Sequence, residues 1–272
     1  MYLGIDVGGT KTLAATLTNE GVITESVKFP TPHNYHEFIT QLEATIRGFK
    51  HQDYRAAGIA VPGKVDRIHG LGVAFGNLPW KNVPIQADLE RISGAPVALE
   101  NDANAAALSE AMLLKTDYDV VLYVTIGTGI GTGIIVRQKI DEVFEDTEGG
   151  HILLDFKGKL VKWESFASGH AIFDRFGKRA SDINDARTWK IISHDLARGM
   201  IDLIAMVQPD VIVLGGGIGT HYPKYKKFLN DELKRYQTPL TPIPPIKQAQ
   251  RPEEAVVYGC YDLAKEKYGT TA

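Results

Sequence analysis

The chain opens with short runs of apolar residues that end in glycine or in a turn-forming polar group. Three such runs cover residues 2–7, 12–18 and 22–29, and they are separated by Gly8-Gly9 and by residues 19–21. Short apolar runs bounded in this way predict β-strands joined by tight turns. A small sheet is therefore expected at the N-terminus.

Farther along the chain, apolar residues also recur at helical spacing. Phe38, Leu42, Ile46 and Phe49 are separated by 4, 4 and 3 residues, which predicts an amphipathic helix. Strands that alternate with helices are typical of the α/β class, and β-rich segments that begin near residues 2 and 120 predict two related lobes with a cleft between them. Similar patterns predict strands at 56–61, 96–99, 120–126, 134–136 and 211–214, helices at 85–92, 103–114, 189–207, 222–235 and 253–267, and loops at 127–133 and 239–245.

The composition narrows the class of protein. Of 272 residues, 44% are hydrophobic and 23% are charged, as in most globular proteins. A net charge of −3 gives no broad attraction to nucleic acid or to anionic membranes, so neither is expected as a partner. No apolar run approaches the roughly 20 residues of a membrane helix, and residues 1–6 show no signal peptide. Since Cys260 is the single cysteine, no disulfide within the chain is expected, and a cytoplasmic location is predicted.

A glycine turn follows the first predicted strand and carries candidate phosphate-binding groups. It consists of Gly8, Gly9, Thr10 and Lys11, after the strand that contains Asp6. Glycines let backbone N–H groups approach phosphate oxygens, and an aspartate at the strand end could hold Mg2+, directly or through water. A plain hairpin turn would have the same glycines. We favour the hypothesis that the turn binds phosphate and that Asp6 positions the metal.

Two more glycine-rich segments follow predicted strands. Glycine and threonine alternate at residues 125–133, and three glycines are consecutive at 215–217. The first segment suits a polyanion that passes close to the backbone, although a barrel corner or a bulge is the alternative. The second would let a flat group such as adenine approach, although a strand-to-helix turn looks the same. The candidate nucleotide-binding residues here are Gly127, Thr128, Gly129, Gly131, Gly215, Gly216 and Gly217.

Polar side chains that suit sugar hydroxyls are spread over several loops. Carboxylate and amide groups bind hydroxyls because each can make two hydrogen bonds. Each could instead be structural: Asn101 or Asp102 could cap the following helix, and His151 could be a buried histidine with internal hydrogen bonds. The candidate sugar-binding residues are Asn77, Asn101, Asp102, Glu148, His151 and Glu164.

Taken in order, these segments resemble the ROK family (repressors, open reading frames, kinases), a branch of the actin-like ATPases. The three glycine segments are similar to the family's two phosphate loops and its adenosine loop. Residues 76–80, Gly-Asn-Leu-Pro-Trp, resemble the glucokinase sugar loop, and residues 100–104 resemble the catalytic segment. Residues 148–151 and 163–169 resemble the family's Glu-x-Gly-His and Glu-x-x-x-Ser-Gly motifs. The resemblance covers nearly the whole chain.

The resemblance implies a two-lobed actin-like ATPase (ribonuclease H-like) fold and a hexokinase-type enzyme. One lobe would comprise residues 1–100 and 255–272, and the other residues 101–254. The implied reaction transfers the γ-phosphoryl group of ATP to a hexose hydroxyl, O6 of glucose, with Asp102 as the general base. The implied cofactors are ATP and Mg2+, the implied partner is a small sugar, and the implied assembly is a homodimer.

The chain departs from the family in the segment after His151. Many ROK kinases bind zinc there through that histidine and three cysteines, whereas residues 152–163 contain no cysteine. One histidine cannot complete a tetrahedral zinc site, so no zinc site is expected. Packing by Leu153, Phe156 and Trp163 is expected to hold Glu164 in place instead.

Four alternatives stay open at this point. Polyphosphate-dependent glucokinases also lack the cysteines, so the phosphoryl donor could be polyphosphate. The sugar could be N-acetylmannosamine or N-acetylglucosamine instead of glucose. A ROK repressor would need an N-terminal helix-turn-helix, for which no room is expected before the first strand. A non-catalytic sugar sensor is the fourth alternative, and Asp102 argues against it.

Overall fold

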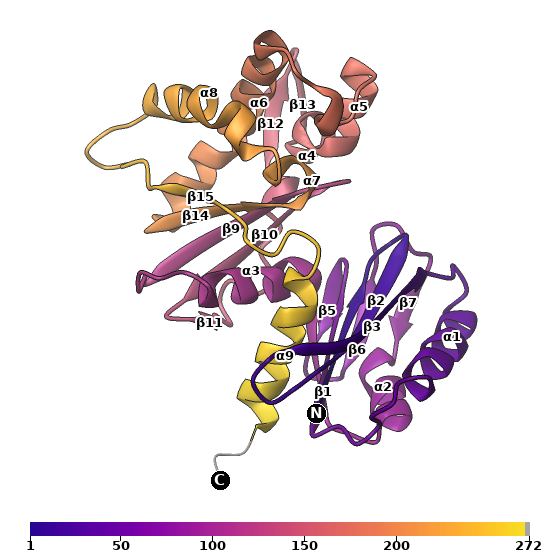
Figure 1. Ribbon diagram of the computed structural model, residues 1–272. Coiled ribbons are helices and arrows are strands. Elements are labelled where there is room, and N and C mark those ends of the chain that lie inside the picture. Colours follow the sequence, from indigo (N-terminus) through magenta and orange to yellow (C-terminus); the bar gives the residue numbers. More distant parts are fainter. Residues whose placement is uncertain (270–272) are drawn as a thin grey trace. The chain divides into compact units, whose positions relative to one another are not determined.

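The computed structural model describes residues 1–269, which form helices and mixed β-sheets (Figure 1). The chain divides into two compact units. Unit 1 comprises Met1–Ser109 together with the C-terminal residues from Glu254, and unit 2 comprises Glu110–Glu253. The chain passes from unit 1 to unit 2 within helix α3 (Asp102–Met112) and returns just before helix α9 (Ala255–Tyr268). Within residues 1–269, no helix has the length and apolar character needed to cross a membrane.

Unit 1 is built on a five-stranded sheet with the strand order β3-β2-β1-β4-β8. β1 runs antiparallel to β2 and parallel to β4, β2 is antiparallel to β3, and β4 is parallel to β8. All five strands were predicted from the sequence, and their ends agree within two residues. The strands are β1 (Tyr2–Val7), β2 (Lys11–Leu17), β3 (Ile23–Pro30), β4 (Ala56–Val61) and β8 (Val97–Asn101), and the further helices of the unit are α1 (Tyr35–Arg47) and α2 (Ile85–Ser93).

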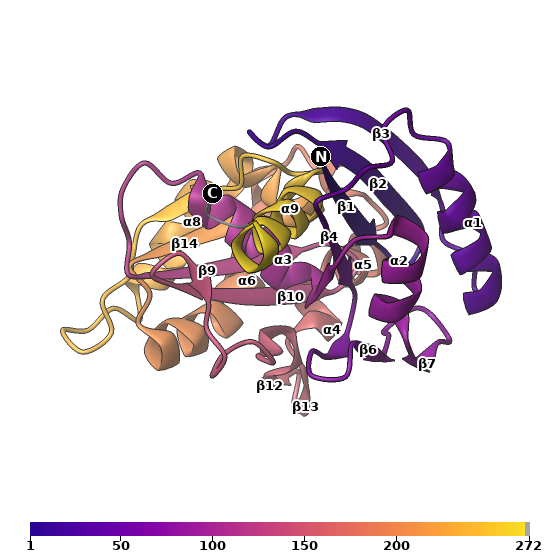
Figure 2. The same ribbon diagram turned by 90° about the horizontal axis from the view of Figure 1, so that it is seen from below.

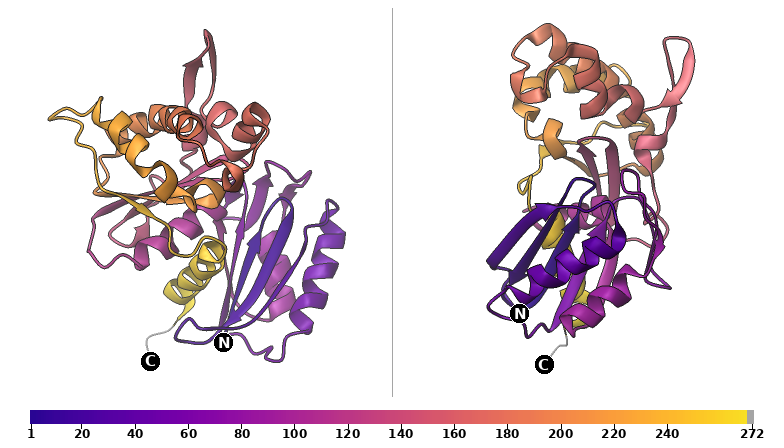
Figure 3. Two further views of the ribbon diagram at one scale, coloured as in Figure 1. Left: turned by 45° about the horizontal axis from the view of Figure 1, so that its top comes forward. Right: turned by 90° about the vertical axis from the view of Figure 1, so that its right-hand side faces the viewer.

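Different helices cover the two faces of this sheet (Figure 2, Figure 3). Side chains alternate along a strand, and Leu3 and Ile5 of β1 lie in the core shared with α1 and α2. Tyr2 points to the other face, where it packs with Val257 of α9. Asp6 lies an even number of residues from Tyr2, so it faces the same side of the sheet as Tyr2.

The stretch between residues 62 and 84 contains three short strands that the sequence did not predict. They are β5 (Lys64–Asp66), β6 (Leu71–Ala74) and β7 (Lys81–Val83), and they form an antiparallel sheet. Each strand has only three or four residues, so alternation of apolar and polar positions is too brief to reveal it. This sheet places residues 76–80 in the connection between β6 and β7.

Unit 2 repeats the strand topology of unit 1. Its sheet has the order β11-β10-β9-β14-β15, with β9 antiparallel to β10 and parallel to β14, as β1 is to β2 and β4. The two β-rich segments therefore resemble each other in strand order and strand direction as well as in their pattern of apolar residues. The strands are β9 (Val120–Ile126), β10 (Ile130–Val136), β11 (Lys139–Ile140), β14 (Val211–Gly215) and β15 (Ile246–Gln248).

Helices and one hairpin complete unit 2 around a single apolar core. Trp189 and Tyr225 stack at 5.0 Å between ring centroids and join the two longest helices of the unit, α6 and α8. The helices are α4 (Glu164–Ala167), α5 (Gly169–Phe176), α6 (Ala186–Val207), α7 (Gly216–Gly219) and α8 (Tyr222–Lys234), the 3-10 turns are Gly149–His151 and Ala180–Asp182, and the hairpin is formed by β12 (Leu153–Phe156) and β13 (Lys159–Lys162).

The predicted loop at 127–133 is wrong in its second half. β10 begins at Ile130, which pairs with Ile126, so only residues 127–129 form the turn. Gly131 is a strand residue paired with Thr125 and is not part of the loop. The alternating glycines hid this strand because glycine weakens the apolar pattern by which strands are recognised.

Candidate active site

The first glycine loop is the tight turn of the β1–β2 hairpin. The N–H of Gly8 donates to the carbonyl oxygen of Lys11 at 3.0 Å. Thr31 braces this turn, because its hydroxyl donates to the carbonyl oxygen of Gly8 at 2.8 Å and its N–H donates to that of Thr10 at 3.0 Å. The backbone of residues 8–11 is therefore a plain hairpin turn, which was the alternative to a phosphate loop in the sequence analysis. Binding of phosphate by this turn, Gly9 included, stays a prediction.

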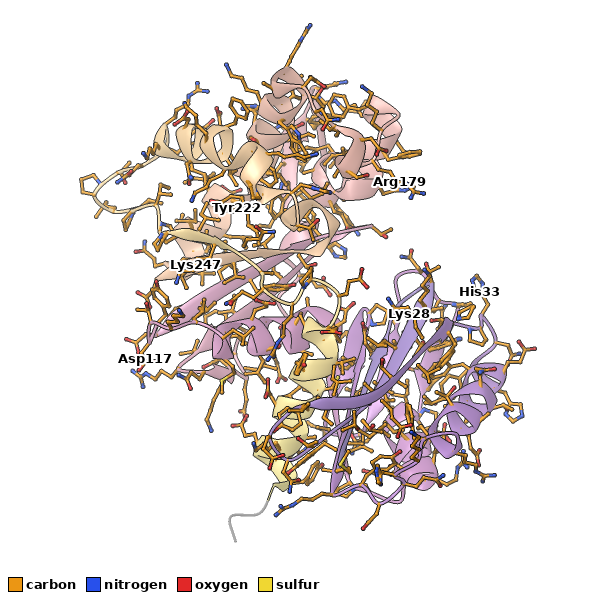
Figure 4. The ribbon with its side chains drawn as sticks, in the orientation of Figure 1. Lys28, His33, Asp117, Arg179, Tyr222 and Lys247 are labelled. Carbon is orange, nitrogen blue, oxygen red and sulfur yellow. The ribbon has the colours of Figure 1, made fainter. Side chains whose placement is uncertain are left out.

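Asp6 lies near the end of β1, in surroundings that disfavour its charge. Burial, the largest cause, and the negative charge of Asp102 raise the pKa of Asp6 to about 7, while Lys28, labelled in Figure 4, opposes the shift. Two carboxylates that disfavour each other's charge suit a divalent cation. Carboxylate oxygens also match the ligand preference of Mg2+, which takes one or two carboxylates and completes its shell with water and phosphate oxygens.

Asp102 is the first residue of α3 and follows β8 directly. The side-chain oxygen of Asn101 accepts from the backbone N–H groups of Ala103 at 2.8 Å and Asn104 at 3.3 Å, so Asn101 caps the helix. The amide group of Asn101 donates to the carbonyl oxygen of Gly63 at 2.9 Å, which ties the cap to the neighbouring chain. One carboxylate oxygen of Asp102 also accepts from the N–H of Ala103, at 2.8 Å. The start of α3 is thus held in place on both sides of the predicted base.

The predicted sugar loop at 76–80 is anchored by its buried residues. Trp80 lies within 5.3 Å of Phe75, Phe38 and Tyr35 between ring centroids, and its indole N–H donates to the carbonyl oxygen of His33 at 2.8 Å. Asn77 is exposed. A side chain added at Gly9 would come within 3.0 Å of the Asn77 Cβ atom, so Asn77 lies against the first glycine loop.

The second glycine loop, at residues 127–129 in unit 2, lies against Glu164. A side chain at Gly129 would come within 2.7 Å of one Glu164 carboxylate oxygen, and the N–H of Ile130 donates to the same oxygen at 3.4 Å. The N–H of Gly169, the first residue of α5, donates to the carbonyl oxygen of Gly127 at 2.7 Å. This loop and the predicted sugar-binding Glu164 are therefore neighbours in the fold.

Three predicted sugar-binding residues of unit 2 come together, and a lysine joins them. The Nε2 atom of His151 lies 3.2 Å from Glu164 Oε1, and the Nζ atom of Lys162 lies 3.1 Å from His151 Nε2. Burial, the largest cause, and the nearby Glu164 raise the pKa of Glu148, while His151 and Lys162 lower it. The cluster combines two carboxylates, an imidazole and an ammonium group, which can all bond to hydroxyls. Lys162 was not predicted from the sequence.

The segment after His151 is the β12–β13 hairpin, held by aromatic packing. Phe156 stacks on Phe166 of α4 with 4.4 Å between ring centroids and 5° between planes. Trp163 is fully buried, and its indole N–H donates to the carbonyl oxygen of Asp195 at 3.1 Å. The predicted role of Leu153 is wrong, because its side chain is 58% exposed on the outer face of the hairpin. Among residues 1–269, no group of three or more His, Cys, Asp or Glu side chains is placed to hold a metal ion.

A pocket of about 570 Å3 lies within unit 2, next to the second glycine loop. Of the three glycines at 215–217, only Gly217 lines it. Gly215 packs against Tyr123, and Gly216 has a positive φ of 71°. Figure 4 shows Arg179 on the segment that follows α5, at the rim of this unit. The lining combines the predicted residues Gly127, Thr128 and Gly217 with Phe173, Arg179 and His221, which were not predicted.

Phe173, Arg179 and His221 could not be predicted, because they belong to no recognisable sequence motif. They come from α5, from the 3-10 turn after it and from the start of α8, so only the fold brings them together. Burial, the largest cause, and the nearby Lys224 lower the pKa of His221, which favours its neutral imidazole. Phe173 is 47% exposed and lines the pocket, so its ring is accessible to a ligand there.

Comparison with known proteins identifies the family of the chain. The family model described as the ROK family matches residues 2–267. A glucokinase of Streptomyces coelicolor is 27% identical over 311 residues, which cover 98% of this chain and 98% of that protein. An N-acetylmannosamine kinase of Vibrio vulnificus is 30% identical over 247 residues, which cover 80% of this chain and 83% of that protein.

A solved structure extends the likeness to three dimensions. The ROK family glucokinase from Streptomyces griseus, crystallised in complex with glucose and AMPPNP, superposes with a TM-score of 0.84 and 26% identity over 97% of this chain and 99% of that one. The likeness confirms the predicted α/β class and the two-lobed actin-like ATPase fold. The chain therefore belongs to the ROK family, among its sugar kinases.

Proposed function

We propose that this chain phosphorylates glucose on O6, with ATP as the donor and Asp102 as the general base. The observation that carries the proposal is the position of Asp102, which starts α3 directly after the cap residue Asn101 and lies close to Asp6. In phosphoryl transfer, a carboxylate accepts the proton of the attacking hydroxyl while metal and phosphate-binding groups stabilise the transferred group.

The phosphate-binding groups are the two glycine turns. The N–H groups of residues 8–11 bind phosphate oxygens in unit 1, and those of Gly127, Thr128 and Gly129 do so in unit 2. Asp6 would hold Mg2+, directly or through water. When bound, Mg2+ neutralises negative charge on the transferred phosphoryl group.

The sugar is bound by polar groups that the fold keeps in place. Glu148, His151 and Glu164 converge in unit 2, where the His151–Glu164 contact of 3.2 Å orients both side chains. The candidate sugar ligands of unit 1 are the exposed amide of Asn77 and the second N–H of the Asn101 amide, whose other N–H donates to Gly63. Carboxylates and amides that each make two hydrogen bonds discriminate between hydroxyl arrangements, because a missing or inverted hydroxyl leaves a polar group unpaired.

The pocket of unit 2 supports ATP over polyphosphate as the donor. It joins Gly127 and Thr128 to an apolar part formed by Ile218 and the exposed ring of Phe173. A purine base can stack on such a ring, at a gain of about 1 kcal/mol. Inorganic polyphosphate has neither a base nor a ribose and would leave this part of the pocket empty.

An N-acetylhexosamine is the second candidate substrate. The observation in its favour is the 30% identity to an N-acetylmannosamine kinase, which is higher than the 27% identity to the glucokinase. N-acetylmannosamine and glucose differ at C2, so the two substrates would need different space beside the sugar-binding cluster. A homodimer and a cytoplasmic location stay predictions, and sedimentation of the purified protein would test the dimer.

A coupled phosphorylation assay tests the proposal. Glucose, mannose, fructose, N-acetylglucosamine and N-acetylmannosamine are each supplied with Mg-ATP and, separately, with polyphosphate and Mg2+. Glucose with ATP is expected to give the highest kcat/KM, and NMR of the product is expected to show the phosphate on O6. Turnover of none of the sugars would contradict the kinase reaction, since sugar binding without turnover is what a sensor would show. Faster turnover with polyphosphate would contradict the choice of donor.

A further inference from the structure

A buried ion pair lies next to the start of α3. The guanidinium group of Arg67 donates from Nε to Glu100 Oε2 at 2.9 Å and from Nη2 to Glu100 Oε1 at 2.5 Å. The Arg67 side chain is 18% exposed and that of Glu100 is 5% exposed. Two parallel hydrogen bonds between guanidinium and carboxylate fix the orientation of both groups, which a single contact does not.

The same carboxylate also bonds to both sides of Asp102. Glu100 Oε1 accepts from the backbone N–H of Asn101 at 2.7 Å and from the side-chain amide of Asn104 at 3.0 Å. Asn101 precedes Asp102 and Asn104 follows it by two residues. Glu100 therefore holds the backbone before Asp102 and the first turn of the helix after it, and Arg67 holds Glu100.

Arg67 is itself set in place by a local turn. Asp66 ends β5, and its carboxylate accepts from the backbone N–H groups of Ile68 at 3.1 Å and His69 at 2.9 Å. This Asx turn fixes the chain between β5 and β6, where Arg67 lies. Arg67 is 33 residues before Glu100 in the sequence. The segment that carries Arg67 therefore has a defined conformation that does not depend on α3.

We propose that Arg67 and Glu100 are positioning residues, which hold the Asp102 carboxylate in the orientation required to take the hydroxyl proton. The inference rests on the proposed role of Asp102. Neither residue needs to touch the sugar or the nucleotide. Their effect is on the geometry of the base, so they act on the rate of the chemical step more than on the binding of substrate.

If Arg67 and Glu100 only stabilised the fold, the rate would follow the stability of each variant. Two variants that differ in the charge left at Glu100 separate the rate from the stability. Arg67→Met leaves the Glu100 carboxylate buried without its cation, and such an uncompensated charge is destabilising. The double variant Arg67→Met/Glu100→Gln removes both charges, so its unfolding midpoint is expected to return toward that of the wild type. The two-pronged contact to Glu100 is absent from both variants, so the rate is expected to stay low in both.

The experiment compares these variants with Arg91→Met. Arg91 is the exposed control: its side chain is 55% exposed and forms ion pairs at 3.6 Å with Glu43 and Asp88 in the same unit. Three quantities are measured on the full chain: the kcat and sugar KM of phosphorylation, the thermal unfolding midpoint, and hydrogen exchange of the backbone amides at residues 101–104.

In Arg67→Met and in the double variant, kcat is expected to fall roughly 100-fold while the sugar KM stays within about threefold of the wild type, as a displaced base predicts. Amide exchange at 101–104 is expected to become faster in both, and Arg91→Met is expected to change none of these quantities. If kcat recovers together with the unfolding midpoint in the double variant, or if Arg67→Met keeps kcat within about twofold, the positioning role is overturned.

Two complications are covered by the same set of measurements. If Arg67→Met does not fold, the double variant decides the matter by its kcat at a restored midpoint. If the wild type phosphorylates no sugar, the proposed function fails, and the positioning inference is decided by exchange alone. Faster exchange at 101–104 in the double variant would then support it, and unchanged exchange would overturn it.

Discussion

Three carboxylates of unit 1, those of Asp6, Glu100 and Asp102, serve different purposes around the junction of β8 and α3. Asp6 is disfavoured as an anion by burial and by Asp102, which suits a metal ligand. Glu100 is neutralised by Arg67 and bonds to the backbone, which suits a support. Asp102 lies between capped and supported neighbours, which suits a base with a defined orientation. The chemistry of each carboxylate follows from its partners and not from its residue type.

The carboxylate of Glu148 gives a prediction that depends on pH. Its folded-state pKa is raised, mainly by burial, above the ordinary value of 4.5. A raised pKa means that the charged form is disfavoured in the folded state, so stability is lost as pH rises through the raised pKa. Without sugar, Glu148→Gln is expected to unfold at a higher temperature than the wild type at pH 8 and at a similar temperature at pH 4.

Calorimetry at both pH values checks this expectation, and the sugar KM of the same variant provides the functional half of the test. Glu148→Gln is expected to raise the sugar KM, because the amide offers one acceptor oxygen to the sugar hydroxyls where the carboxylate offers two. A variant that is less stable than the wild type at pH 8 would contradict the assigned cause of the pKa shift.

The candidate residues that could be predicted from the sequence were those that stand in a compact motif. Asn101, Asp102 and Glu148 were each named because their neighbours along the chain share the pattern. Arg67 and Phe173 could not be named in this way. Their partners lie far away in sequence, and only tertiary packing brings Arg67 to Glu100 or Phe173 to the second glycine loop.

At the scale of whole elements, α9 and α3 approach each other at a glycine. A side chain on Gly259 of α9 would lie 1.9 Å from the backbone oxygen of Ala105 in α3. On the next residue of α9, the Cys260 thiol is fully buried and donates to the carbonyl oxygen of Ile5 at 3.3 Å. Close backbone packing therefore connects the helix that begins with Asp102 to α9 and to β1.

Gly259→Val is expected to destabilise the protein by at least about 2 kcal/mol, because backbone atoms cannot move aside as a flexible side chain can. Lys267→Val is the matched control, since it places the same side chain at an exposed position of the same helix and costs only about 0.5 kcal/mol in helix propensity. Urea unfolding of both variants measures the difference. Equal stability of the two variants would show that α9 and α3 are not in backbone contact.

The β12–β13 hairpin gives a second prediction for an element. Phe156→Ala removes the ring that stacks on Phe166 and lies 5.7 Å from the Arg175 guanidinium, and it is expected to cost about 2 kcal/mol and to raise the sugar KM through movement of Glu164. Leu153→Ala, on the exposed face of the same hairpin, is expected to change stability by less than about 0.5 kcal/mol. If the two variants behave alike, the aromatic stack does not hold Glu164.

Helices and strands could be predicted from the sequence where they were long enough for the apolar pattern to be recognised. α6 (22 residues) was predicted over 189–207 from apolar spacing, and the strands β1, β4 and β9 were predicted from apolar runs bounded by turn residues. β5 to β7 and the β12–β13 hairpin were not, since strands of three or four residues are stabilised by pairing and not by a visible pattern. The start of β10 was missed because its glycines lack side chains.

At the scale of the whole molecule, the two units share one strand order, and each packs its sheet against apolar clusters of its own. Each unit places its glycine turn between the first two strands of its sheet, at residues 8–11 and 127–129. The pattern of two β-rich segments predicted this duplication. The order of the strands did not follow from the sequence, because it depends on pairing between distant segments such as β14 and β9.

The same duplication assigns different tasks to the two units. Unit 1 holds the predicted base and metal ligand, whereas unit 2 holds the pocket beside the second glycine loop and the cluster of Glu148, His151 and Glu164. In the proposed reaction Asp102 takes the proton, whereas Glu148, His151 and Glu164, three of the predicted sugar ligands, belong to unit 2. Loss of the base should therefore affect the rate while leaving sugar binding largely intact.

The rate of ATP-dependent glucose phosphorylation by Asp102→Asn, compared with the wild type, tests this account most directly. The asparagine keeps the size of the side chain and can still accept from the N–H of Ala103, but it cannot take the hydroxyl proton. We expect kcat to fall by roughly 100-fold to 10,000-fold, with glucose affinity by calorimetry changed by less than about threefold. A kcat within about threefold of the wild type would contradict the assignment of Asp102 as the general base.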